Sequence, residues 1–157
     1  MQEEKYRIVL ADDEALTRLD LKEMLVELGH QVVGEARNGL EALELAEKLR
    51  PDLVIMDVRM PRMDGVKAAK LMHGRKLAPV LLLTAYSDKD IIRRSVEAGV
   101  MGYLTKPVLE RDLSPAVRVA VQRAREMGRL KRYKVVLQQN LQQERQQRLR
   151  RAGKALV

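Results

Sequence analysis

Three carboxylates follow apolar runs of the chain and are the first candidates for chemistry. Asp12 and Asp13 come directly after the run 6–11, and Asp57 closes the run 52–58. If these runs are neighbouring strands of a parallel sheet, the acids meet at one edge, where their repulsion raises a proton affinity or recruits a cation. Hard oxygen ligands with room left for water favour Mg²⁺. Each acid taken alone has another explanation: Asp12 and Asp13 could cap a helix, and Asp57 could be an acid of a loop.

A hydroxyl and an ammonium group are expected on the same rim. Thr84 lies near the end of the run 79–85, and Lys106 follows the run 101–105. An ammonium beside a carboxylate that accepts a phosphoryl group would stabilise the added negative charge. Without the acids, Lys106 would be a solvated strand-end charge and Thr84 an ordinary strand residue.

Five short apolar runs, alternating with amphipathic stretches, must position these residues. The runs cover 6–11, 31–36, 52–58, 79–85 and 101–105. Two of them are apolar without alternation, which is typical of strands covered on both faces. Helical stripes lie between the runs, at 21–28 before Gly29, at 42–49 before Pro51, at 66–72 and, with the poorest periodicity, at 88–98. This order predicts an α/β fold, a doubly wound parallel sheet of five strands with helices on both faces.

The last 45 residues differ from the rest in charge and periodicity. Residues 113–157 contain 12 lysines and arginines against two acids, whereas residues 1–112 contain 18 against 20. Apolar residues at helical spacing run from Leu113 to Met127 and continue less regularly to Leu141. We expect one long final helix that first packs on the sheet and then leaves it, where it pairs with a second copy or frays. Charge alone leaves nucleic acid, an anionic membrane and an acidic partner open.

Composition excludes several other classes. The 157 residues include no cysteine and only two histidines, so disulfide scaffolds, thiolate sites and cysteine nucleophiles are excluded and a histidine-rich metal cluster is not expected. No apolar run approaches the roughly 18 residues of a membrane span, and residues 1–4 lack the basic start of a signal peptide. We therefore expect a cytoplasmic protein with no membrane partner.

Four motifs together resemble the receiver domains of bacterial two-component response regulators. They are LADDE at 10–14, VIMDVRMPRMDG at 54–65, LTA at 83–85 and YLTKP at 103–107. The resemblance covers about residues 5–125, with every motif in order. It implies a flavodoxin-like sheet of strand order 2-1-3-4-5, to which the extended C-terminal helix is added.

The resemblance implies a role for each site residue. Asp57 would be the phosphoacceptor, attacking the phosphohistidine of a sensor histidine kinase. Asp13 and Asp57 would bind Mg²⁺ directly, while Asp12 would act through water. Arg59 would offer its backbone carbonyl to the metal. Lys106 would offset charge on the phosphoryl oxygens, and the bond to Pro107 resembles the family's cis peptide. With an ordinary pKa of about 3.9, Asp57 would be ionised at neutral pH without a base.

Thr84 and Tyr103 resemble the family's switch pair. The hydroxyl would move to the phosphoryl oxygen, and the aromatic ring would enter the vacated space from the surface. This would remodel the face made by the fourth helix, the fifth strand and the fifth helix. A half-buried strand aromatic is the alternative for Tyr103. Arg59, at a position variable in the family, is predicted to alter the lifetime of the acylphosphate.

The segment 92–101 and its flanks are especially similar to receivers of antitermination (ANTAR) RNA-binding regulators. We expect a receiver domain at 1–125 and a basic, glutamine-rich helical extension at 126–157, which is a coiled-coil linker or the start of a truncated output module. We expect a homodimer through the C-terminal helix and the switch face, and the resemblance implies an RNA output through the tail. A stand-alone receiver whose tail makes only protein contacts is the alternative.

Two classes of enzyme that are built on a similar sheet agree less well with this sequence than a receiver domain does. A flavin or dinucleotide protein needs a glycine- or hydroxyl-rich phosphate loop after the first strand, where residues 12–14 are acidic. A phosphatase of the dehalogenase type with an aspartate nucleophile has a second acid two residues later, where Arg59 stands. A receiver that is never phosphorylated would be expected to lack one acid or the lysine. We therefore expect no enzyme activity beyond self-phosphorylation and self-dephosphorylation.

Overall fold

The sheet has five parallel strands in the order β2-β1-β3-β4-β5, as predicted. The computed structural model describes residues 4–85 and 89–155. The strands are β1 (Arg7–Ala11), β2 (Gln31–Ala36), β3 (Leu53–Asp57), β4 (Val80–Thr84) and β5 (Gly102–Thr105). Each lies within the apolar run expected for it, so the hydrophobic pattern placed all five.

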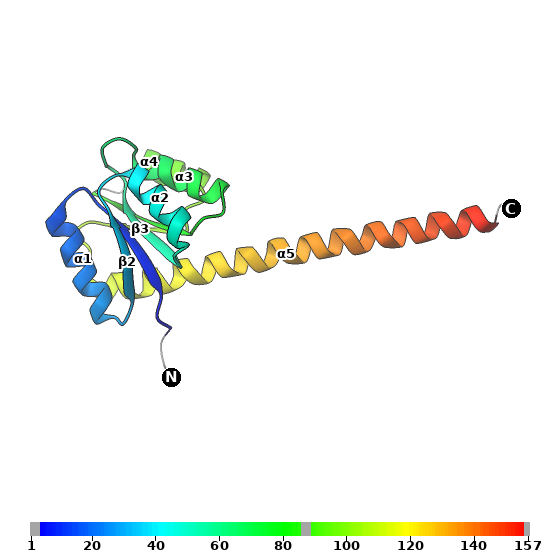
Figure 1. Cartoon of the computed structure of the whole chain (residues 1–157), viewed down its shortest axis with the longest axis horizontal. Helices are drawn as coiled ribbons and strands as arrows, with labels where there is room; N and C mark the ends of the chain where they lie inside the picture. The colour runs from blue at the N-terminus through cyan, green and yellow to red at the C-terminus, as the bar shows by residue number, and fades with distance from the viewer. Residues whose placement is uncertain (1–3, 86–88, 156–157) are drawn as a thin grey trace. The chain divides into compact units, whose positions relative to one another are not determined.

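Helices connect the strands and are bounded by local capping signals. They are α1 (Ala15–Glu27), α2 (Gly39–Leu49), α3 (Gly65–Gly74), α4 (Lys89–Glu97) and α5 (Glu110–Ala155). The side chains of Asn38 and Asp64 cap α2 and α3 by accepting hydrogen bonds from backbone N–H groups three residues later. After α1 the chain turns at Gly29, whose φ of 91° favours glycine. Figure 1 shows α1 on one side of the sheet and α2 with α3 on the other.

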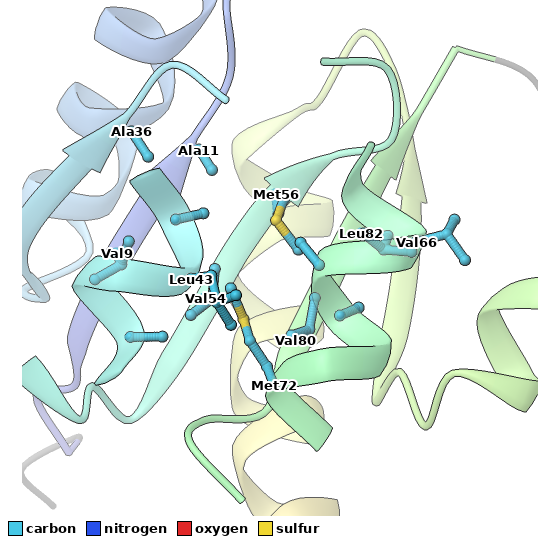
Figure 2. Close-up of a cluster of buried hydrophobic side chains, with 14 of the residues drawn as sticks. Val9, Ala11, Ala36, Leu43, Val54, Met56, Val66, Met72, Val80 and Leu82 are labelled. Atoms are coloured by element: carbon cyan, nitrogen blue, oxygen red, sulfur yellow. The ribbon is translucent and has the colours of Figure 1, made fainter. Parts of the chain in front are cut away.

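The core has two layers because successive strand residues face opposite sides of the sheet. One layer includes Val54, Met56, Val80 and Leu82, which cluster with side chains of α2 and α3, including Met72 (Figure 2). The alternate strand residues are equally buried, and so are large side chains of α1 and the first turns of α5. These are Ile8, Leu10, Leu21, Leu25, Leu53, Ile55, Leu81, Leu83, Leu113 and Val117. Burial on both faces explains the strands without alternation.

By its internal contacts the chain divides into two compact units, Met1–Arg123 and Ala124–Val157. In the second unit the large apolar side chains of the described residues are exposed, including Leu130, Tyr133, Leu137 and Leu141 of the predicted stripe. The predicted boundary between residues 125 and 126 stays a prediction. Among the described residues, no helix is both long enough and apolar enough to cross a membrane.

Candidate phosphoacceptor site

Asp57 ends β3 at the carboxyl edge of the sheet. Its main chain pairs with Leu83 of β4, which brings Thr84 to the neighbouring strand end. The Asp57 residue is 8% exposed, and Thr84 is buried as well. Asp57 therefore belongs to the strand, and the alternative of a loop acid is wrong.

Asp12 lies next to Asp57 because β1 and β3 are neighbours in the sheet. Asp12 is 1% exposed, whereas Asp13 is exposed. Glu14 is the N-cap residue of α1, so capping does not explain the two aspartates. The backbone N–H of Glu14 donates to Oδ1 of Asp12 at 2.9 Å. One carboxylate oxygen from each of Asp12, Asp13 and Asp57 lies within 4.8 Å of the others. The predicted convergence of three acids is confirmed.

Lys106 places its ammonium group between the two buried acids. Its Nζ donates to Oδ2 of Asp12 and to Oδ2 of Asp57, each at 3.0 Å. Its backbone N–H donates to the carbonyl of Thr84 at 2.8 Å, which fixes the start of this loop to the end of β4. The peptide bond from Lys106 to Pro107 is cis, as the resemblance implies. Lys106 is thus a structural partner of the acids and not a solvated strand-end charge.

The electrostatics of the site differ from the simplest expectation. Burial raises the pKa of Asp57, and the nearby Asp12 carboxylate adds to this, although Lys106 and a backbone hydrogen bond from Arg59 oppose it. An ordinary Asp57 pKa is therefore wrong for the metal-free protein. Burial lowers the pKa of Lys106, but its hydrogen bonds to Asp12 and Asp57 outweigh burial and leave that pKa raised. The ammonium stays charged, and the ionised form of Asp57 is poorly solvated because of its burial, a cost that a bound cation would offset.

A cavity of about 290 Å³ opens above these groups. It provides room for a small anionic group bound to Asp57. Its lining includes Asp13, Glu14, Asp57, Val58, Arg59, Thr84, Ala85, Ile91 and Lys106. Arg59 is one of these lining residues, and it is also exposed to solvent.

Tyr103 lies outside this cavity. The residue is 46% exposed and lines a separate groove of about 530 Å³ formed by α4, β5 and the first turns of α5. Val96, Pro115 and Val119 also line this groove. The structure therefore separates the acid cluster from the predicted switch aromatic, with Thr84 on the acid side.

Gly65 holds the loop after Asp57 close to the site. Its backbone N–H donates to the carbonyl of Val58 at 2.7 Å. A Cβ atom at this position would overlap the carbonyl oxygen of Asp57. The Asp64 side chain accepts from the N–H of Lys67 at 2.8 Å, so the helix-cap explanation for Asp64 holds as well. The Asp-Gly pair thus ends the loop and starts α3 at once.

A second layer of charged residues, which was not predicted from the sequence, surrounds Asp12. The guanidinium of Arg18 donates to the backbone carbonyl of Asp12 at 2.7 Å and to Glu35 at 3.1 Å. Lys22 also contacts Glu35, at 3.3 Å. Arg18 follows Asp12 by six residues and Glu35 lies on β2, so no short motif signals this contact. Arg18 anchors the main chain that carries Asp12.

This fold and site define a family. The sequence matches the response regulator receiver domain over residues 8–118, and the chain belongs to that family. The fold is that of solved receivers. Over 76% of this chain and 98% of the other, it matches the signal receiver domain of the response regulator NarL from Mycobacterium tuberculosis, with a TM-score of 0.73 and 34% identity.

The chain is also similar to curated proteins named as transcriptional regulators. The chain is 49% identical over 136 residues to the transcriptional regulatory protein PdtaR of Mycobacterium tuberculosis, covering 87% of this chain and 66% of that protein. It is 34% identical over 122 residues to the uncharacterized transcriptional regulatory protein YxjL of Bacillus subtilis, covering 76% and 56%. The chain thus spans less than two thirds of the length of these relatives.

Proposed function

We propose that Asp57 accepts a phosphoryl group from the phosphohistidine of a sensor histidine kinase. The observation that carries this proposal is the ammonium of Lys106, 3.0 Å from both buried carboxylates beside an open cavity. An oxygen of Asp57 forms the new O–P bond while the P–N bond of the phosphohistidine breaks. The electron pair of the P–N bond stays with the imidazole. Lys106 and the Thr84 hydroxyl offset the charge on the transferred oxygens, so catalysis is positioning and electrostatics.

The three acids fit a Mg²⁺ ion by the chemistry of their donors. Carboxylate oxygens within 4.8 Å of one another, with Asp13 exposed, suit a hard cation that keeps some of its water. Both oxygens of Asp12 already accept protein hydrogen bonds, from Glu14 and Lys106. Asp57 also accepts hydrogen bonds, from Lys106 and from the backbone of Arg59, so exposure is the better guide. Asp13, the most exposed of the three acids, and Asp57 are proposed as direct ligands, with Asp12, the most buried, acting through water and the Arg59 carbonyl as a further ligand. When bound, Mg²⁺ supplies charge neutralisation for phosphoryl oxygens.

Phosphorylation is transmitted by Thr84 and Tyr103 in this proposal. The buried hydroxyl of Thr84 turns towards the new phosphoryl oxygens, and the exposed ring of Tyr103 moves inward to occupy the vacated space. The groove between α4, β5 and α5 changes shape as a result, because Tyr103 lines it. This face and the C-terminal helix pair with a second copy of the chain.

The output proposed for the tail is RNA binding in the control of transcription. Its support is the basic charge of residues 113–157, the resemblance to antitermination regulators and the likeness to relatives named as transcriptional regulators. Fluorescence anisotropy with RNA across a salt series is expected to show binding that weakens steeply as salt rises. Absence of binding at low salt would leave a receiver whose tail makes only protein contacts.

Labelling by acetyl phosphate tests the central step. With Mg²⁺ present, we expect one phosphoryl group per chain by intact-protein mass spectrometry, and no labelling after Asp57→Asn. Asp64→Asn is the matched control, because Asp64 is the next acid along the chain and lies outside the cavity lining. Labelling of Asp57→Asn at the wild-type level would end the proposal.

Arg59 is expected to prolong the phosphorylated state. Its exposed side chain lines the cavity, where a guanidinium can contact phosphoryl oxygens and hinder water. After removal of the phosphodonor, Arg59→Ala should lose its label several-fold faster than the wild type. Lys67→Ala, which removes an exposed cation of α3, controls for net charge. An unchanged or longer half-life for Arg59→Ala would contradict this role.

A further inference from the structure

The second unit carries an exposed apolar stripe that is shorter than its helix. Met127, Leu130, Leu137 and Leu141 are each at least 40% exposed. Together with Lys134 they follow one another at steps of three and four residues, which places them on one side of the helix. Beyond Leu141 the same side carries Glu144, Arg148 and Arg151. The apolar stripe therefore covers about two heptads and ends at Leu141.

We propose that residues 126–141 form a parallel, in-register, two-stranded coiled coil with a second copy of this chain. This inference rests on the proposed pairing of the C-terminal helices and adds its direction and register. In heptad terms, Met127, Lys134 and Leu141 occupy the a positions, and Leu130 and Leu137 occupy the d positions. Each apolar side chain would then pack against its own equivalent in the second copy.

Charge complementarity selects the parallel direction. Glu126 is a g residue and Lys131 an e residue. In a parallel pair, a g residue faces the e residue five positions later in the other chain, so Glu126 meets Lys131 twice, once on each side. An antiparallel pair brings e against e and g against g. The e positions 131, 138 and 145 hold no acid, and the g positions 126, 133 and 140 hold no cation. No such antiparallel pair is attractive.

Lys134 fixes the register and the number of strands. A single lysine at an a position is tolerated in a two-stranded coiled coil, because its stem lies along the apolar seam while its ammonium reaches water. A shift by one heptad would place Lys134 against Met127 or Leu141 of the other chain. The Lys134 side chains of the two copies would then no longer face each other. The contact between Glu126 and Lys131 would be lost as well.

The absence of cysteine from the chain makes a direct test possible. Full-length Leu130→Cys and Leu137→Cys should each form a disulfide-linked dimer rapidly under mild oxidation, because identical d residues face each other only in a parallel, in-register pair. Val136→Cys, an exposed residue on the outer side of the same helix, is the matched control. Equal rates for Leu137→Cys and Val136→Cys would overturn the proposal.

Exchanging the charges of Glu126 and Lys131 provides a second test of the parallel pairing. Glu126→Lys and Lys131→Glu should each raise the dissociation constant of the dimer by roughly threefold, as expected for an exposed ion pair. The double variant should restore the wild-type value, and additive weakening would contradict the predicted pairing. Repeating the crosslinking with Asp57→Asn separates this inference from the proposed phosphorylation. Crosslinking at Leu137 without phosphorylation supports the coiled coil even if the phosphoacceptor proposal fails.

Discussion

Lys106→Met is expected to slow phosphorylation by acetyl phosphate by roughly two to three orders of magnitude, the loss typical of removing one preorganised donor to developing charge. The Nζ atom lies 3.0 Å from Asp57 Oδ2, where it can follow the transferred oxygens. Methionine keeps the unbranched shape of the lysine stem but lacks its terminal ammonium group and donates no hydrogen bond. The initial rate of mass-shifted protein, at saturating Mg²⁺, measures the effect.

A control separates this electrostatic role from a general effect of charge. Lys70→Met removes an exposed lysine of α3 and should leave the labelling rate unchanged. Lys106→Met should also melt at a lower temperature, because two buried carboxylates lose their cation. A folded Lys106→Met protein that labels within twofold of the wild type would show that Lys106 does not act on the phosphoryl group.

The second large effect is on stability, and its sign follows from the raised pKa of Asp57. In the folded, metal-free protein this carboxyl binds its proton more tightly than in the unfolded chain. The free energy of unfolding therefore falls as pH rises from the ordinary carboxyl pKa through the raised one. Above that window the ionised group destabilises the fold. Asp57→Asn lacks this penalty and should melt a few degrees higher at neutral pH in the presence of a chelator.

The comparison is made as melting temperature against pH. The advantage of Asp57→Asn should vanish at pH values below the ordinary carboxyl pKa, where both proteins are neutral at this position. Added Mg²⁺ should raise the melting temperature of the wild type more than that of Asp57→Asn. Glu44→Gln removes an exposed charge on α2 and should show neither effect. A lower melting temperature for Asp57→Asn at neutral pH would contradict burial as the dominant influence.

Much of the fold could be predicted because it depends on local periodicity. The strand β2 coincides with its predicted run, and each of the other strands is one residue shorter than its run at one or both ends. The helix α4 was the weakest prediction, and its structure explains why. Val96 is 73% exposed and Ile91 and Ile92 are only partly buried, so this helix shows little of an apolar stripe. Edge elements with small buried faces leave weak patterns in a sequence.

The residues that form the site could be predicted from the sequence, but their burial and their neighbouring contacts could not. Strand ends place the acids, Thr84 and Lys106 together by topology alone. The raised pKa of Asp57 depends on how deeply the surrounding loops bury it. The contact of Arg18 with the Asp12 carbonyl depends on the orientation of α1 over the sheet. Both arise from tertiary packing, which no spacing of residues records.

The loop that follows Asp57 is held by its main chain at both ends. Gly65 binds Val58, and the N–H of Gly39 donates to the carbonyl of Met63 at 3.1 Å. Glycine is required at both positions because a Cβ would strike backbone atoms. Between these anchors, Arg59, Pro61 and Arg62 are exposed. Substitutions at these exposed positions leave the backbone around Asp57 in place. If Asp57 is the phosphoacceptor as proposed, side chains of this loop can set the lifetime of the phosphorylated state independently of the acceptor's position.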